Sequence, residues 1–434
     1  MQKQKTTLVW FKTNLRSQDS VVLQKAMESS QRTIGVYCIS PNLFQRNQFG
    51  FKKMEVFRAK FLLETLQDLT QQLNLLNVSL LVYFDTPETV FPLLIEKYNI
   101  CSVYYEKEWT HEECEQIQLI KNKVRLGVDF HSYYDQFLFH PDDVPFHYKD
   151  TPKVFTPFRK ILEKQTEVRP IISVSAQEKS GVLETVPQIP SLADLGFDPP
   201  VQLPHSAFPF KGGETHAKDR LNHYLFESKQ LGVYKKTRNG LIGTDYSSKF
   251  SAWLANGSLS ARQVYWAVKT FEQQHFSNQS TYWMIFELIW RDFFKFIALK
   301  HGNSIFKIEG ILNQNYNWSR NQKYVNQWIN GTTPDDFVNA NMIELKKTGW
   351  MSNRGRQNVA SYFAKNQKLD WRIGAAYFES VLIDYDVHSN YGNWMYVSGV
   401  GNDPRDRVFN VKSQAERYDP HGKFRKLWLQ SKLF

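Results

Sequence analysis

Paired charges stand in two tryptophan-containing stretches of the chain. The stretch TGWMSNRGRQNVAS carries Arg354 and Arg356, and guanidinium groups cannot lose their charge in proteins. The stretch LIDYDVHSNYGNW carries Asp384 and Asp386. These carboxylates need donors, and Arg356 is a partner of the right charge. Metal binding is the competing interpretation, but no histidine and carboxylate set completes a ligand sphere, so the sequence predicts no metal site.

A third stretch, TYWMIFELIWRDFFKFIALKH, is apolar nearly all round and predicts a buried helix. Glu287, Arg291 and Lys295 nevertheless recur at a spacing of four residues and form one polar stripe. Burying unpartnered charges is costly. The stripe therefore either pairs with itself or lines a polar cavity, and the neighbouring Trp290 favours the cavity.

A fourth stretch, GTDYSSKFSAWLANGSLSAR, places small hydroxyl residues and a lysine before a helical run. Ser247, Ser248, Lys249 and Ser251 offer hydroxyl, ammonium and backbone N–H donors to a phosphate. The plainer interpretation is that these serines cap a helix.

The composition limits the possible settings of these residues. A chain of 434 residues with 42% hydrophobic residues predicts two or three domains with sizeable cores. No apolar run reaches the ~18 residues that span a bilayer, so no membrane partner is expected. Three scattered cysteines lack metal-ligand spacing and fit a reducing compartment, which predicts a cytoplasmic location.

Charge and aromatic residues are concentrated in the second half of the chain. The first 200 residues contain 23 Lys and Arg against 24 Asp and Glu, whereas the remainder contains 31 against 19. Ten of the twelve tryptophans also follow residue 200. A basic, tryptophan-rich half either binds nucleic acid or is a solvated surface over an aromatic core.

The elements that must position these residues differ between the two halves. Residues 1–134 alternate strand-like runs with amphipathic helices, among which 54–76 is the longest, and this predicts a parallel sheet covered on both faces. The strand candidates are TTLVWF (6–11), RTIGVYCI (32–39), VSLLVYF (78–84), CSVYY (101–105) and VDFHSYY (128–134). The turn after the first of them has no glycine fingerprint, which argues against an ordinary dinucleotide site.

Residues 135–205 contain ten of the seventeen prolines and predict a long surface connector, partly ordered by packing. Residues 206–434 predict an all-helical domain, with helical periodicity in 214–231, 260–275, 281–301 and 372–385.

Taken together in their order along the chain, the four stretches resemble the photolyase/cryptochrome family, and in detail its DASH class. The opening VWFKTNLRSQDSVVL resembles the family's first strand and turn. The resemblance spans the chain and implies an N-terminal Rossmann-like α/β antenna domain (1–134), a connector (135–205) and a C-terminal helical domain (206–434) that binds FAD and DNA.

The resemblance assigns roles to positions of this chain. The FAD phosphates and ribityl chain are expected beside Tyr234, Ser247, Ser248, Lys249, Phe250, Ser251 and Arg291. Asp384, Asp386 and Asn390 are expected at the flavin ring, with Arg356 paired to Asp384 beneath it.

The implied reaction is light-driven splitting of a cyclobutane pyrimidine dimer in DNA by an electron from reduced FAD. Glu287 and Asn353 are the expected catalytic residues, and Trp290 and Arg354 are expected to face the dimer. Single-stranded DNA is the expected substrate, because Tyr396 and Gln357 stand where duplex-repairing relatives usually have tryptophan and methionine. No oligomer is expected.

Two further assignments come from the resemblance by position. Trp394, Trp371 and Trp318 match a chain of tryptophans that reduces the flavin, although core packing is the alternative for each. Glu108 matches a position that binds a folate antenna, 5,10-methenyltetrahydrofolate, although an exposed glutamate is the default.

Two other functions remain open from the sequence. One is a blue-light photoreceptor that signals through flavin photoreduction, although the chain lacks the long C-terminal tail that signalling cryptochromes often carry. The other is a nucleic-acid-binding flavoprotein without repair activity. Residues 331–345 depart from the family pattern, with Pro334, Asn339 and Ile343 among the changes, and a different loop path is expected there.

Overall fold

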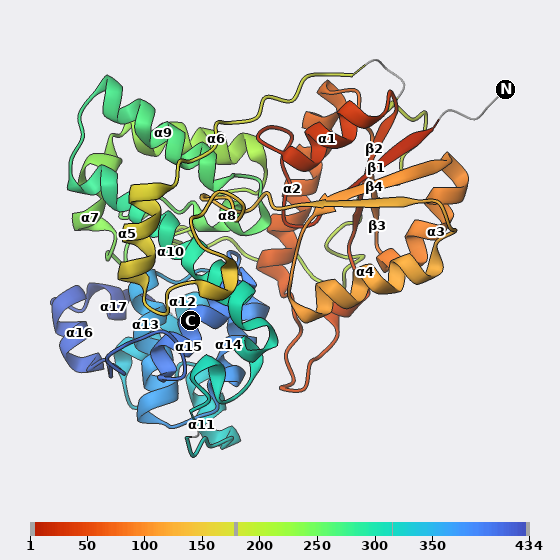
Figure 1. Cartoon of the computed structure of the whole chain (residues 1–434). Helices are drawn as coiled ribbons and strands as arrows, with labels where there is room; N and C mark the ends of the chain where they lie inside the picture. The colour runs from red at the N-terminus through yellow and green to blue at the C-terminus, as the bar shows by residue number, and fades with distance from the viewer. Residues whose placement is uncertain (1–4, 178–180, 315, 431–434) are drawn as a thin grey trace.

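The computed structural model describes residues 5–177, 181–314 and 316–430. A part built on a β-sheet lies on the right of Figure 1, and a helical part lies on its left. The chain forms the sheet-containing part first and the helical part second.

The sheet contains five parallel strands in the order β3-β2-β1-β4-β5. The central strand β1 is buried at all five positions, as a strand covered on both faces must be. The parallel sheet and its five predicted strands are therefore confirmed. The strand bounds are Thr6–Trp10 (β1), Thr33–Cys38 (β2), Leu80–Tyr83 (β3), Ile100–Glu106 (β4) and Asp129–Tyr133 (β5).

Four helices cover the two faces of the sheet. One apolar cluster joins α1 and α2 to the sheet through residues such as Val22, Leu66 and Val9. A second cluster joins α3 and α4 to the other face, with Phe91 and Ile120 at its centre. The helix bounds are Val21–Ser29 (α1), Val56–Leu75 (α2), Pro87–Tyr98 (α3) and His111–Lys123 (α4).

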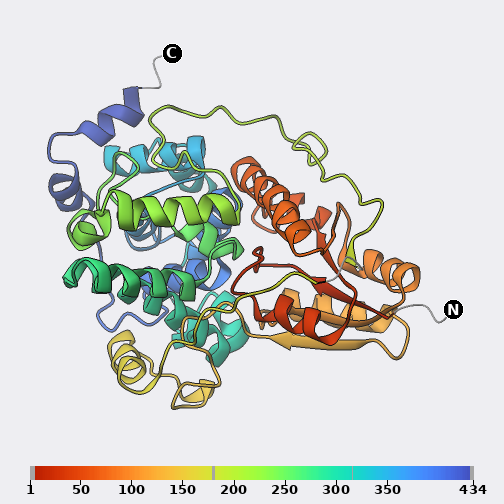
Figure 2. The same ribbon diagram turned by 90° about the horizontal axis from the view of Figure 1, so that it is seen from above.

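The segment expected to be a connector contains one helix, α5 (Phe155–Gln165). α5 packs on the helical part, and the ring of Phe155 stacks on Trp290 with 3.8 Å between centroids. The later stretch of the segment runs along the outside of both parts, as Figure 2 shows in yellow-green. The domain boundaries at 134 and 205 stay a prediction.

The second half is helical, as predicted. α10 runs through its centre, and thirteen of its residues are buried. The predicted helix 214–231 breaks into α6 and a π-helical turn, His223–Glu227. The predicted helix 372–385 ends at Val381, before the turn that carries Asp384. The helices are α6 (Glu214–Asn222), α7 (Tyr234–Thr237), α8 (Ser251–Asn256), α9 (Ala261–Gln274), α10 (Gln279–His301), α11 (Gln322–Ile329), α12 (Asp336–Thr348), α13 (Asn353–Ser361), α14 (Trp371–Val381), α15 (Val387–Ser398), α16 (Val411–Tyr418) and α17 (Lys423–Leu429).

The unusual residues of 331–345 form a closed loop and a helix start. The side chain of Asn339 accepts a hydrogen bond from the Thr333 backbone N–H at 2.8 Å and donates one to the Thr333 carbonyl at 2.8 Å. Asp335 caps α12 by accepting from the Val338 N–H at 2.9 Å. Ile343 packs against Gly331. Asn339 therefore ties the loop to the helix that follows it.

The two parts meet through buried ion pairs. Arg16 pairs with Asp135 at 2.7 Å, and Arg262 pairs with Asp19 and Asp135, each at 3.0 Å. All four side chains are at most 5% exposed. Each buried charge has an opposite partner, which is the condition for burial without a large penalty.

Candidate functional site

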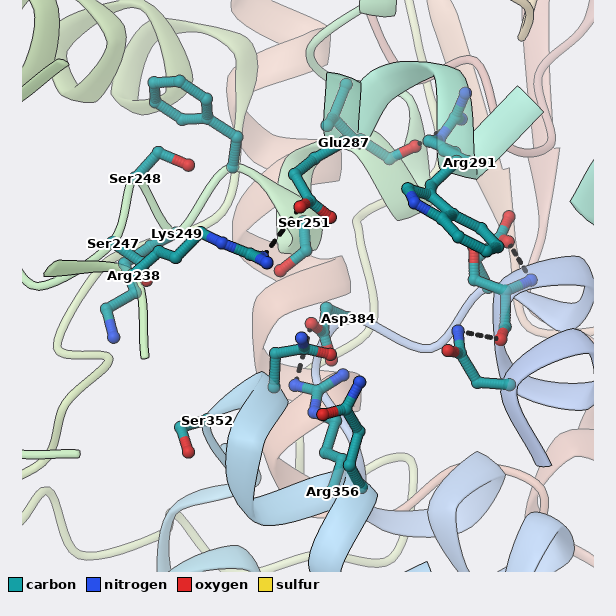
Figure 3. Close-up of a pocket in the computed structure, with 18 of the residues that line it drawn as sticks. Arg238, Ser247, Ser248, Lys249, Ser251, Glu287, Arg291, Ser352, Arg356 and Asp384 are labelled. Atoms are coloured by element: carbon teal, nitrogen blue, oxygen red, sulfur yellow. Dashed lines mark hydrogen bonds and ion pairs between the residues drawn. The ribbon is translucent and has the colours of Figure 1, made fainter. Parts of the chain in front are cut away.

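A cavity of about 430 Å³ opens in the helical part, within the size range of cofactor and ligand sites. α7, α8, α10, α13 and α15 contribute to its walls, together with the loops before α8 and α15. Figure 3 shows side chains from several of these elements converging on it. The cavity brings together these residues predicted from the sequence: Tyr234, Ser247, Ser248, Lys249, Phe250, Ser251, Glu287, Trp290, Arg291, Asn353, Arg356, Gln357, Asp384, Asp386 and Tyr396.

The polar stripe of α10 takes its partners from other elements rather than from itself. Glu287 and Arg238 form an ion pair at 2.7 Å, which Figure 3 shows as a dashed line. Arg291 donates to the backbone carbonyl of Leu254 at 3.0 Å. Glu287 and Arg291 line the cavity, whereas Lys295 lies behind it and donates to Asp386 at 3.1 Å. The stripe is therefore one wall of a polar cavity.

Burial and nearby cations set the charge states on this wall. Burial raises the pKa of the Glu287 carboxyl, and Arg238 opposes that rise. Burial alone would raise the pKa of Asp386, but Lys295, His388 and Arg291 together with the Ser389 hydrogen bond hold that pKa below its usual range. Burial and Lys295 lower the pKa of His388 to about 3. Lys295 and Asp386 form a charged pair beside a neutral imidazole.

The loop before α8 is fixed by an arginine that the sequence analysis did not identify. Arg220 of α6 donates to the carbonyls of Ser248 at 3.0 Å and Ser247 at 3.2 Å, and pairs with Asp245 at 2.7 Å. The carbonyls of the two serines thus turn toward Arg220. No sequence signal near the serines points to this residue, because Arg220 lies about 28 positions earlier and acts only in the folded chain.

Lys249 carries a buried amino group that makes no contact with a carboxylate that the structure describes. The residue is 2% exposed, and its Nζ lies 3.2 Å from the centroid of the Tyr246 ring. Nζ has no hydrogen-bond partner among the residues that the structure describes. Burial lowers its pKa well below the ordinary value, and burial raises the pKa of the nearby Glu344 to about 8. An anionic group in the cavity would supply the missing partner of Lys249.

The ion pair expected between Arg356 and Asp384 is present. Arg356 donates to Asp384 Oδ2 at 2.9 Å and to the Met351 carbonyl at 2.9 Å. Figure 3 shows the pair on the side of the cavity opposite Glu287. The other carboxylate oxygen, Asp384 Oδ1, is buried and has no partner in the described part of the chain. It can accept a hydrogen bond from a ligand ring.

Asp386 and Asn390 differ from Asp384 in how many of their polar atoms have hydrogen-bond partners in the protein. Asp386 caps α15 by accepting from the Ser389 N–H at 2.7 Å, and its other oxygen accepts from Lys295. Asn390 donates through Nδ2 to the Ala375 carbonyl at 3.0 Å, so its Oδ1 is the free end of the amide. Asn390 lines a smaller adjoining pocket of about 90 Å³, together with Asp384 and Trp394.

Residues expected to face a substrate come from α10, α13 and α15, and most of them line the cavity. Asn353 and Gln357 come from α13, while Trp290 and Tyr396 meet edge to face with ring centroids 6.0 Å apart. Arg354 is the exception. It lies outside the described cavity lining, where it donates to Gln357 Oε1 at 2.8 Å and to Asn239 at 3.1 Å, and so its expected contact with the cavity is replaced by a contact with Gln357.

Of the three predicted relay tryptophans, Trp371 lies on α14, Trp394 lies on α15, and Trp318 lies in the segment before α11. Trp394 packs on Gly374, where an added Cβ would lie 2.2 Å from its ring, and Gly374 is one turn from Trp371 in α14. A β-bridge between Ser319 and Leu369 brings the neighbouring Trp318 to the start of α14. Within the described residues no ring contact joins two of the three directly.

Glu108 lies away from this cavity, just after β4. Its carboxylate pairs with Lys12 from the end of β1, and burial lowers the pKa of Lys12 to about 8. Next to it, the Trp109 ring stacks on His388 with 4.6 Å between centroids. Trp109 Nε1 is buried and has no partner within the described ranges.

The cavity also contains lining residues that were not predicted from the sequence, among them Arg238, Arg407 and Phe409. Arg238 holds Glu287, and Arg407 and Phe409 reach the cavity from the loop after α15. Arg238 follows the predicted Tyr234 by four positions, which is the one sequence signal for it. Among the described residues, no group of three His, Cys, Asp or Glu side chains is placed to hold a metal.

The donor set fits an anionic, two-part cofactor. One end of the cavity offers serine hydroxyls and the unpartnered Lys249, and the other offers Asp384 Oδ1 and Asn390 Oδ1 as acceptors. Two family models match the chain: "DNA photolyase" over residues 7–177 and "FAD binding domain of DNA photolyase" over residues 283–432. The Cryptochrome DASH of Gloeobacter violaceus is 45% identical over 427 residues, with 98% of this chain and 85% of that protein covered.

The chain belongs to the photolyase and cryptochrome family. The Cryptochrome DASH proteins of Synechocystis and Danio rerio are 44% and 42% identical over 98% and 99% of this chain, and the match covers 87% and 84% of those proteins. These relatives place the chain in the cryptochrome DASH branch, so the family expected from the motifs is confirmed.

Solved structures of the family share the whole architecture. A Synechocystis cryptochrome superposes with a TM-score of 0.94 at 42% identity, covering 99% of this chain and 89% of that one. A bacterial class III photolyase from Agrobacterium tumefaciens gives 0.82 at 25% identity, with 99% and 87% covered. The α/β plus helical fold is thus confirmed, and FAD is the cofactor of the helical domain.

Membership of this family makes the chain a flavoprotein with a light-driven function. The described helices include none long and apolar enough to cross a membrane. Glu287, Arg291, Asn353, Arg356 and Asp384 lie within the region matched by the FAD-binding model, residues 283–432, whereas Tyr234 and the loop 247–251 precede it.

Proposed function

We propose that this protein uses light and FAD to split cyclobutane pyrimidine dimers in DNA, mainly in single strands. The observation that carries the proposal is that one cavity joins the candidate flavin-binding residues to the candidate dimer-binding residues. Arg356 and Asp384 line this cavity, and so do Glu287, Asn353 and Trp290. The proposal is supported by the similarity of this chain to a solved bacterial photolyase and to the DNA photolyase family model.

FAD, when bound, supplies light absorption and one-electron chemistry. Lys249 and the hydroxyls of Ser247, Ser248 and Ser251 would hold its phosphates, because Lys249 Nζ is buried without a partner in the described residues. Asp384 Oδ1 would accept from a ring N–H, and the ion pair with Arg356 holds that carboxylate in place. Asn390 presents Oδ1 as an acceptor, because Nδ2 is used on Ala375.

Glu287 and Asn353 would hydrogen-bond the edge of the dimer. Arg238 holds Glu287 at 2.7 Å and so fixes where its second oxygen points. Burial raises the pKa of Glu287, which extends the pH range in which it can donate a proton to a base carbonyl. Trp290, stacked on Phe155 with an interplanar angle of 8°, would offer a rigid apolar face to the dimer.

The preference for single strands would follow from the polar character of the remaining wall. Base stacking on an aromatic residue is worth ~1–3 kcal/mol, and extracting a dimer from a duplex costs on the order of a few kcal/mol. Tyr396 and Gln357 offer less apolar surface than tryptophan and methionine would. A single strand has already lost most of its stacking, so this weakness penalises duplex DNA more.

Two other assignments belong to the same proposal. Trp394, Trp371 and Trp318 would carry electrons from the surface to the flavin along the packed route through Gly374. A folate antenna would be held at Glu108 and the unpartnered Trp109 Nε1, with Lys12 giving up part of its contact with Glu108. We also propose that the antenna domain ends at residue 134 and that the helical domain begins after residue 205.

The deciding experiment is repair of an oligonucleotide with one dimer, in single- and double-stranded form, under blue light and in darkness. We expect light-dependent repair that is faster on the single strand and is lost in Glu287→Gln. Glu227→Gln, a change at a 60%-exposed glutamate, is the matched control. Light-driven reduction of bound FAD without any repair would reject the enzyme and leave the photoreceptor function.

A further inference from the structure

The surface end of the tryptophan route carries a tyrosine that the proposed function does not use. The rings of Tyr316 and Trp318 meet edge to face with 5.4 Å between centroids. Tyr316 is 37% exposed, whereas Trp318 is half-buried and its indole Nε1 has no hydrogen-bond partner in the described residues. Of the two rings, the tyrosine is therefore the more open to solvent.

The phenol of Tyr316 lies close to groups that can accept its proton or change its pKa. Its hydroxyl makes a long 3.5 Å contact with the carbonyl oxygen of Gly399 at the end of α15. Partial burial and then the neighbouring Asp406 carboxylate raise its pKa. Lys365 pairs with Asp406 and also lies 5.2 Å from the centroid of the Tyr316 ring. A carboxylate and a cation thus face the phenol from two different segments.

An open hollow of about 350 Å³ lies over both rings, with Ile308, Glu309 and Gln314 among its lining residues. The Ile308 carbonyl on this wall accepts the indole N–H of Trp371 at 3.0 Å. The hollow therefore lies over the outer end of the route and gives small molecules in solution access to Tyr316.

We propose that Tyr316 is the outermost redox residue of this protein and passes electrons from a small reductant in solution to Trp318. The proposal rests on the tryptophan relay of the proposed function. The oxidised Trp318 cation radical takes one electron from Tyr316, and the phenol proton moves to a carboxylate oxygen of Asp406. The products are neutral Trp318, a neutral tyrosyl radical and protonated Asp406. A thiol or an enediol in solution then returns one electron and one proton to the phenol.

This step separates the oxidising equivalent further from the flavin and places it where a reductant can reach it. A radical left on half-buried Trp318 would return more readily to the flavin. Coupling the electron to a proton also makes the step harder to reverse, because both must come back together. Lys365 works against proton transfer to Asp406, so water competes with Asp406 as the acceptor.

The test is flash photolysis of the FAD-loaded protein, with the tyrosyl and tryptophanyl radicals followed by transient absorption and by electron paramagnetic resonance. We compare the unaltered protein with Tyr316→Phe, and use Tyr324→Phe as the control, since Tyr324 is another exposed tyrosine, 44% accessible, on α11. We expect a tyrosyl signal in the unaltered protein and the control. In Tyr316→Phe the tyrosyl signal should vanish and the tryptophanyl radical should live longer.

Asp406→Asn supplies a second measurement that a merely structural role would not move. It keeps both rings but removes the proton acceptor, and we expect tyrosyl formation to slow on the order of 100-fold, the lower end of what a positioned proton acceptor contributes. Equal tryptophanyl lifetimes in the unaltered protein and Tyr316→Phe, with no tyrosyl signal, would overturn the inference and leave the relay intact. No tryptophanyl radical in any variant would overturn the relay and this inference together.

Discussion

Arg356→Met leaves Asp384 buried without its cation, and the size of the loss can be worked out from the structure. The Asp384 side chain is 2% exposed and that of Arg356 is 23% exposed, with 2.9 Å between the paired atoms. Removing one partner of a buried pair costs ~3–5 kcal/mol. Because Arg356 is partly open to water, we expect about 2–4 kcal/mol in the free energy of unfolding.

The stability lost in Arg356→Met has an upper limit, and that limit depends on pH. A stranded carboxylate can take up a proton instead, and at pH 7 protonating an ordinary aspartate costs about 4 kcal/mol. At pH 5 the same protonation costs about 1.5 kcal/mol. The penalty of Arg356→Met should therefore shrink as the pH falls, which a simple loss of packing would not do.

The assay is a double-mutant cycle on the protein without added FAD. Urea midpoints are measured for Arg356→Met, Asp384→Asn and the double variant at both pH values, and converted with a common slope. Arg320→Met is the control, because Arg320 is 63% exposed and Asp370 keeps a second partner, Arg372, at 2.8 Å. A coupling energy below about 0.5 kcal/mol, or a penalty independent of pH, would refute the reasoning.

Three other outcomes follow from the site. Trp394→Phe should strongly slow photoreduction of the flavin, since phenylalanine keeps the packing but resists oxidation, and Trp266→Phe should not; equal rates would reject the relay. Tyr396→Trp should bring duplex repair about fivefold closer to single-strand repair, the equivalent of ~1 kcal/mol of stacking, and an unchanged ratio would reject that role. The affinity for FAD should fall as the pH rises, because burial lowers the pKa of Lys249 and binding phosphate requires the cation; titration by flavin fluorescence should show a flatter profile in Lys249→Met.

Much of the fold was predictable because it depends on short-range pattern. The β-branched and aromatic run at residues 6–11 forms β1, Thr6–Trp10, and the amphipathic run at 54–76 forms α2, Val56–Leu75. The four-residue spacing of Glu287 and Arg291 also predicts that both face one way, and both line the cavity. These features are set by local periodicity, which the sequence shows directly.

The rest depends on contacts that sequence spacing does not contain. Arg354 and Arg356 are two positions apart on α13 and so point roughly 200° apart around the helix. Only Arg356 faces the cavity, while Arg354 faces Asn239 and Gln357. Arg220 comes from α6 and Arg238 follows α7, and both meet the site only after folding. Which partner a buried charge takes is thus a property of the packed structure.

The same logic explains how the α/β part is used. Ligands of open parallel sheets bind beyond the carboxyl ends of the strands, where the strand order reverses, and here that point lies between β1 and β4. Part of the turn after β1 is pressed against the helical part. Gly257 at the end of α8 has φ of +75°, and an added Cβ would lie 1.9 Å from the Thr13 carbonyl oxygen.

A turn used for docking has no need of glycines that cradle a phosphate, which accounts for their absence after β1. Its polar groups are used to hold the second part: Arg16 donates to the Gly257 carbonyl at 3.1 Å and pairs with Asp135. Because Arg262, one helix further on, shares Asp135 and Asp19, the sheet also fixes α9, which leads directly into α10. The sheet therefore acts on the cavity mechanically, by setting the position of the helix that carries Glu287 and Arg291.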